Sequence, residues 1–154
     1  MKYLCLLIPL ALPTAAMAEA PNLKTPSPVL YLADNLDEPD KLGYCLDTYG
    51  RGASDRAQIH SCKPQGGDVQ FQYDEATGRI QSATFDNTCL DISGGAFALT
   101  ECSDAAGQKF DFDPTTGEIR TGSDTSICLT SAPESRQAGP FVGRDLALTN
   151  CEST

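Results

Sequence analysis

The stretch FALTECSDAAGQKFDFDPTTGEIR, residues 97–120, contains pieces that recur elsewhere in the chain. FQYDEATGRI at 71–80 matches FDFDPTTGEI at 110–119, and LALTNC at 146–151 matches FALTEC at 97–102. Self-similarity of this kind is typical of a structure built from repeated units. The repeat is therefore the first guide to the fold.

Three cysteine-leucine segments mark the starts of the repeated units. They are YCLDTYG at 44–50, TCLDISG at 88–94 and ICLTSAP at 127–133. Each is followed by a strand-like stretch that closes on a cysteine, namely AQIHSC, FALTEC or LALTNC. The sequence thus contains three copies of one plan.

The cysteines fit this plan. Cys5 lies in an apolar N-terminal run, and six cysteines remain, which in an exported chain favours three disulfides. Because the chain has no C-x-x-C and one histidine, it offers no zinc ligand set, and we expect neither a metal nor another cofactor. Joining the opening cysteine of each unit to its closing one predicts the bridges Cys45–Cys62, Cys89–Cys102 and Cys128–Cys151.

Short alternating segments make up the units. AQIHS, VQFQYD, GRIQSA, QKFDFD, GEIRTG and LALT are separated by Gly, Asp, Pro and Thr-Gly turns. No long window after residue 18 has helical spacing of apolar residues, so the sequence predicts an all-β fold. The ATG and TTG before Arg79 and Glu118 are typical of hairpin turns whose glycine has a positive φ.

The N-terminal region divides into three parts. Residues 1–18, MKYLCLLIPLALPTAAMA, are typical of a signal peptide cleaved after Ala18, which implies a secreted or periplasmic protein. Residues 19–28 are Pro-rich, and we expect a flexible lead-in before the folded domain at 29–154. The acidic segment 34–41 is expected to be a solvated connection.

Charge and motif content exclude several classes of function. The formal net charge is −10 without a basic cluster, which disfavours nucleic acid and anionic membrane surfaces, and no later apolar run is long enough for membrane insertion. The chain has one histidine, no nucleophile elbow and no P-loop, so we expect no enzyme of those kinds. A carboxylate pair as in glycoside hydrolases stays open, because sequence gives no separation.

Three units of the form CLD, then C, then Q-x-aromatic, then G-x-I resemble the ricin-type β-trefoil lectin family, whose repeats carry Q-x-W. The resemblance implies a β-trefoil, a six-stranded barrel capped by three hairpins. The second unit has Gln108-Lys109-Phe110 at this signature and the first has Val69-Gln70-Phe71, while nothing corresponds after Cys151. One core strand is thus expected to be missing, and the lead-in could fill its place, the edge could stay open, or a partner could supply the strand.

The resemblance also implies a sugar site. In this family a galactose-like sugar stacks on an aromatic platform, while the Asp of C-x-D and a later polar side chain bind its hydroxyls. The ring of Tyr49, in the loop that follows the first C-x-D segment, could take the place of the aromatic platform. Carried over to the first unit, these roles fall on Asp47, Gln58, His60 and Asp68.

The other two units keep less of the pattern. The second has Asp91 but carries Thr100 at the platform and Gly107 at the amide position, and the third has Thr130 and Thr149. We expect both sites to be lost. An Asp after Cys-Leu can also serve only to form its own turn.

Two functional hypotheses follow. The first is an exported, non-catalytic, lectin-like carbohydrate-binding module with at most one working sugar site, in the first unit. The alternative is a β-trefoil protein-interaction subunit of a secreted or toxin-like complex that has lost sugar binding. The altered platforms and the missing strand favour the alternative.

Overall fold

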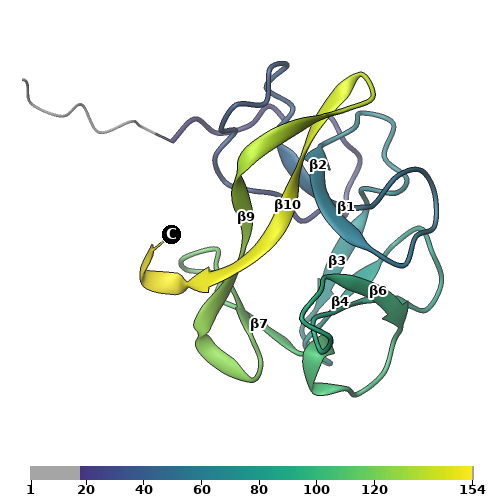
Figure 1. Ribbon diagram of the computed structural model, residues 1–154, viewed down its shortest axis with the longest axis vertical. Helices are drawn as coiled ribbons and strands as arrows, with labels where there is room; N and C mark the ends of the chain where they lie inside the picture. Colours follow the sequence, from purple (N-terminus) through teal and green to yellow (C-terminus); the bar gives the residue numbers. More distant parts are fainter. Residues whose placement is uncertain (1–17, 154) are drawn as a thin grey trace, which may run out of the picture.

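The computed structural model describes residues 18–153, so the expected signal peptide lies outside them except for Ala18. Within these residues the secondary structure is strands and two short 3-10 helices, as the sequence predicts (Figure 1). The elements are β1 (Tyr44–Thr48), β2 (Ala57–Ser61), β3 (Phe71–Asp74), β4 (Arg79–Ser82), β5 (Thr88–Asp91), β6 (Ala98–Glu101), η1 (Ala106–Gln108), β7 (Phe110–Phe112), β8 (Ile119–Thr121), β9 (Asp124–Ala138), β10 (Phe141–Asn150) and η2 (Cys151–Ser153).

The strands form two curled sheets, with the orders β1-β2-β10-β9-β8-β7 and β3-β4-β5-β6. Each cysteine-leucine segment lies on the first strand of an antiparallel hairpin, which is β1–β2, β5–β6 or β9–β10. The leucine after the cysteine faces an apolar residue across each hairpin. These pairs are Leu46–Ile59, Leu90–Leu99 and Leu129–Leu148. The three repeated units and the β-trefoil plan are confirmed.

All three predicted disulfides are present. Cys45–Cys62, Cys89–Cys102 and Cys128–Cys151 have Cα–Cα distances of 4.9, 4.9 and 5.0 Å. Each bridge joins the opening strand of a hairpin to the residue that follows its closing strand. The bridges therefore fix the open ends of the hairpins.

The signature aromatics belong to the core. Phe71 on β3 and Phe110 on β7 are buried together with Ile80, Leu90 and Leu99. Burial of such side chains is the main favourable term in folding. The two phenylalanines thus stabilise the fold and are not available as a sugar platform.

The hairpin β9–β10 is much longer than the sequence indicates. The sequence predicts a strand at 146–149, whereas β10 spans Phe141–Asn150 and pairs with β9 from Ala138 back to Ile127. Pro133 and the polar residues around it hide the strand pattern, and a register shift between Arg144 and Leu146 interrupts the alternation. Strand β10 of this hairpin lies beside β2 of the first unit (Figure 1). The two strands are paired, and Gly143 faces His60.

The acidic segment 34–41 is a loop with most of its residues exposed, as expected of a solvated connection, but Asn35 and Glu38 are buried. Glu38 is buried and accepts hydrogen bonds from the N–H groups of Asp40 and Leu42 and from the Ser61 hydroxyl. The carboxylate replaces the backbone partners that a tight loop lacks. This loop therefore closes one end of the β1–β2 hairpin.

The lead-in 19–28 lies along the first unit. The Asn22 N–H donates to the Lys41 carbonyl at 2.7 Å, and the Thr25 hydroxyl donates to the Lys63 carbonyl at 2.9 Å. It does not occupy the position that corresponds to β3 and β7 in the third unit. Within residues 18–153, β10 is followed by η2 and no further strand.

Candidate functional site

A hollow of about 600 Å³ lies at the first unit, and we refer to it as the first-unit hollow. Its walls come from the loop after β1, from β2, from residues 63–68 and from the tip of the β9–β10 hairpin. The side chains that matter below are Tyr49, Gln58, His60, Lys63, Asp68, Arg136 and Phe141.

Two of the expected carboxylates converge on one lysine. Lys63 Nζ lies 3.1 Å from Asp47 Oδ2 and 2.5 Å from Asp68 Oδ1. Asp68 opens on the hollow, but Asp47 is fully buried beneath Lys63 and does not line it. Burial raises the pKa of Asp47 to about 7. Its Oδ1 has no hydrogen-bond partner within the described residues.

His60 lies next to this group. Its Nδ1 is 3.1 Å from the Ser61 carbonyl oxygen, and because a carbonyl only accepts, this nitrogen carries the hydrogen. Burial lowers the pKa of His60, so the imidazole is neutral near pH 7 and its 3.7 Å approach to Asp47 is not an ion pair. The ring stands edge-on to Phe141 with 5.7 Å between centroids.

Gln58 holds the hairpin tip in place. Its Nε2 donates to the Thr48 carbonyl at 3.0 Å, and its Oε1 accepts from Arg136 Nη2 at 2.7 Å. Both ends of the amide are thus used inside the protein. The structure brings Asp47, Gln58, His60 and Asp68 into one region, and all of them except Asp47 line the hollow.

Sequence reasoning missed Lys63, Arg136 and Phe141. Arg136 and Phe141 come from the third unit, about eighty positions along the chain from β2, and repeat alignment does not place a hairpin tip. Tyr49, considered as a substitute platform, lines the hollow with Arg56 stacked 4.2 Å from its ring centroid. The hollow therefore has three aromatic rings at its wall, which are those of Tyr49, His60 and Phe141.

In the second unit Asp91 lines neither the first-unit hollow nor the hollow where the third unit meets the first. This carboxylate accepts hydrogen bonds from the Ser93 N–H at 2.7 Å and from Gln108 Nε2 at 3.1 Å. The bonds from Ser93 are the main reason that its pKa is lowered. Gly107 packs so closely that an added β-carbon would lie 2.6 Å from Asp91 Oδ1. Asp91 thus forms its own turn.

The third unit has no carboxylate at this position. Thr130 donates to the Ala147 carbonyl at 3.3 Å and lies 3.4 Å from the Thr149 hydroxyl. These two hydroxyls occupy the places of the family's aspartate and platform. Neither offers a charge or a ring.

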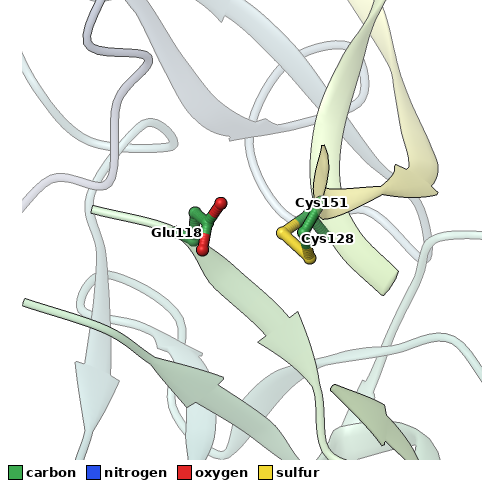
Figure 2. Close-up of side chains that lie close together, drawn as sticks. All are labelled: Glu118, Cys128 and Cys151. Atoms are coloured by element: carbon green, nitrogen blue, oxygen red, sulfur yellow. A yellow bond between two sulfur atoms is a disulfide. The ribbon is translucent and has the colours of Figure 1, made fainter. Parts of the chain in front are cut away.

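A cluster of Glu118, Cys128 and Cys151 has the spacing of metal ligands (Figure 2). Its two sulfur atoms are joined to each other in a disulfide and carry no thiolate. Glu118 Oε2 accepts a hydrogen bond from Arg120 Nη2 at 2.6 Å. The oxidised cluster is therefore not a metal site.

Residues 36–154 match the family described as the ricin-type beta-trefoil lectin domain. The chain belongs to this family of carbohydrate-binding modules. A comparison with curated proteins gave no match.

Among solved structures, the chain is similar to one titled "Crystal structure of GalNAc-T7 with UDP, GalNAc and Mn2+". The TM-score is 0.50 with 18% identity, over 71% of this chain and 18% of that one. This chain therefore spans less than a fifth of that protein, and the likeness shows the fold alone.

Three disulfides indicate an oxidising, extracellular environment. Within residues 18–153 no helix is long and apolar enough to cross a membrane.

Proposed function

We propose that the protein is an exported, non-catalytic carbohydrate-binding module with one working site, the first-unit hollow. One contrast carries the proposal. In the first unit Asp68 lines an open hollow together with aromatic rings. In the second unit the carboxylate of Asp91 accepts hydrogen bonds within its own turn, and in the third unit Thr130 stands in place of the aspartate. A pyranose needs such a ring for its C–H face and fixed polar groups for its hydroxyls.

The roles follow from the contacts. Asp68 accepts a sugar hydroxyl, and the Lys63 ammonium donates to a neighbouring one. Asp47 lies beneath Lys63 and holds its ammonium group in place through an ion pair. Gln58 holds Arg136 in place through a hydrogen bond. His60, Phe141 and Tyr49 supply the apolar surface. A galactose-like ligand is the proposal that family membership supports.

A glycan array of residues 19–154, purified with the disulfides intact, tests this function. The array includes uncharged galactosides and sialylated glycans, since Arg51 and Arg136 also line the hollow. Binding is expected for the unchanged protein, and it should be lost in Asp68→Ala and weakened in Asp47→Ala.

Asp111→Ala is the control, because Asp111 is an exposed carboxylate on β7 that does not line the hollow. It should bind like the unchanged protein. A folded protein that binds no glycan, or an Asp68→Ala variant with full binding, would contradict the proposal.

A further inference from the structure

A second hollow, of about 500 Å³, lies where the third unit meets the first, and we call it the third-unit groove. It is bounded by residues 30–34 before β1, by the turn at 116–119 and by residues 128–131 of β9. It shares no lining residue with the first-unit hollow. Its apolar floor is formed by Leu30, Leu32, Leu46, Ile59, Ile119, Leu129 and Leu146.

Apolar side chains at and beside the groove are less covered than their counterparts in the other units. In the closing strands Ile59 and Leu99 are each 5% exposed, but the corresponding Leu148 is 41% exposed. Ile80 on β4 is fully buried, whereas its counterpart Ile119 on β8 is only partly buried. Leu148 of the third unit and Ile119 of the second are thus less covered than their counterparts in the other units.

In the other units the cover is a strand with an aromatic side chain. Phe110 on β7 of the second unit is 4% exposed, and its N–H donates at 2.7 Å to the carbonyl of Gly78, which lies in the Thr-Gly turn of the preceding, first unit. A β-carbon at Gly78 would lie 3.0 Å from the Phe110 oxygen. At the matching Gly117 an added β-carbon would meet nothing within 4 Å. The space beside Gly117 is where the equivalent strand would lie.

The groove also has an open backbone edge at Tyr31. The neighbouring Leu30 carbonyl and Leu32 N–H bond to Leu46 and Tyr44 of β1. Tyr31 alternates with them, so its own N–H and C=O point away from β1, and no group within residues 18–153 bonds to them. An edge of this kind is a template for another strand.

We propose that the third-unit groove binds an extended segment of a partner polypeptide, which adds a strand at Tyr31 and places an aromatic side chain on the apolar floor. This is β-strand addition, in which backbone bonds give affinity and a side-chain pocket gives specificity. Asp34 at the rim and the net charge of −10 favour lysine or arginine at the outward positions of that segment.

Fluorescence anisotropy with a labelled peptide tests the proposal. The peptide GQKFKFKPTT is residues 107–116, the β7 strand of this chain, with lysine in place of Asp111 and Asp113. It should bind residues 19–154 with intact disulfides, and the native acidic sequence should bind more weakly. Replacing the phenylalanine at the Phe110 position by alanine should weaken binding about tenfold or more.

Two protein variants locate the binding. Tyr31→Pro removes the N–H that the added strand needs and keeps both bonds to β1, so it should weaken peptide binding about tenfold. Tyr31→Ala keeps the N–H and is the matched control. Circular dichroism checks that each protein variant is folded. The alanine-substituted peptide tests the aromatic contact with the unchanged protein, so that test does not depend on the folding of a variant.

Three results would overturn the proposal. They are no binding of the lysine peptide at about millimolar concentration, equal binding of the phenylalanine and alanine peptides, and binding to residues 19–154 but not to the full chain. The last would mean that a segment of the chain itself fills the groove. None of these measurements involves a glycan, so they succeed or fail independently of the sugar-site proposal.

Discussion

The carboxyl group of Asp47 is buried beneath Lys63 and has one oxygen without a hydrogen-bond partner within the described residues. Burial of a carboxylate is unfavourable unless its charge is compensated. Lys63 compensates in part, but Asp68 shares the same ammonium. The aspartate therefore stabilises the arrangement of the site more than it stabilises the fold.

This environment predicts a pH dependence of stability. Burial raises the pKa of Asp47 from 3.8 to about 7, so between these values the folded protein holds a proton that the unfolded chain has lost. The contribution of Asp47 to the free energy of unfolding should then fall as the pH rises from 4 to 7 and stay level above that.

Urea unfolding of the unchanged protein and of Asp47→Asn, at intervals from pH 4 to pH 8, checks this expectation. The difference in unfolding free energy between the two proteins should move in favour of the variant up to about pH 7. Subtracting the two curves removes the titration of His60, which both contain. A difference that does not change with pH would contradict the burial of an ionisable group at this position.

Gly107 is a second residue with a strong expectation. An added β-carbon would come within 2.5 Å of the Ser93 nitrogen and 2.6 Å of Asp91 Oδ1, so Gly107→Ala should destabilise the protein by about 1–3 kcal/mol. Gly94 lies in the same unit with nothing within 4 Å, and Gly94→Ala should change stability by less than about 1 kcal/mol. Thermal unfolding of both variants makes the comparison, and equal stabilities would argue against the close packing around Asp91.

At the scale of elements, the long β9–β10 hairpin links the third unit to the first. Arg144 on β10 is buried and donates to the Ala132 and Pro133 carbonyls at 2.9 and 2.7 Å. Its other amino group bonds to Asp37 in the acidic loop at 2.5 Å. These bonds hold the hairpin where its tip can form one wall of the first-unit hollow.

Arg144→Ala should therefore destabilise the protein by about 1–3 kcal/mol, because it removes a buried side chain together with its hydrogen bonds to two backbone carbonyls and to Asp37. Arg120 is the matched control, since its pairs with Asp113 and Glu118 are partly exposed and Arg120→Ala should cost about 0–1 kcal/mol. Chemical denaturation gives both values. Equal losses would show that Arg144 does not fasten the hairpin.

The elements that sequence predicts well are those whose pattern is local. Strands such as β3 and β7 alternate, carry a signature phenylalanine and end at a Thr-Gly turn, and Gly78 and Gly117 have the expected positive φ values of 69° and 78°. The long hairpin contains proline and polar residues, and its partner is β2, which is far away in sequence. Local pattern does not carry that information.

The same distinction applies to the candidate site. Asp47 and Asp68 were found because the resemblance to the ricin-type family places them, and they do share Lys63. The burial of Asp47 could not be predicted, because the alternation in β1 does not distinguish its side chain from an exposed one and all five residues of that strand are buried. Phe141 was missed because its position depends on the tertiary arrangement of the hairpin.

For the whole molecule, three copies of one plan have diverged into three surfaces. The first unit has an open polar hollow, the second has closed its site around Asp91, and the third leaves an apolar groove beside Leu129. The shared disulfides and core phenylalanines maintain the fold while the surfaces differ. The first-unit hollow and the third-unit groove share no lining residue, so we expect that a ligand in one does not block the other.

The measurement that tests the central claim most directly is an NMR titration of ¹⁵N-labelled residues 19–154 with methyl β-galactoside and with sialyllactose. The account predicts that one of these sugars shifts the amide signals of Asp68, Gly139 and Phe141 around the first-unit hollow, while those of Asp91 and Thr130 stay in place. Shifts centred on Asp91 or Thr130, or no shifts with either sugar, would contradict a sugar site in the first unit.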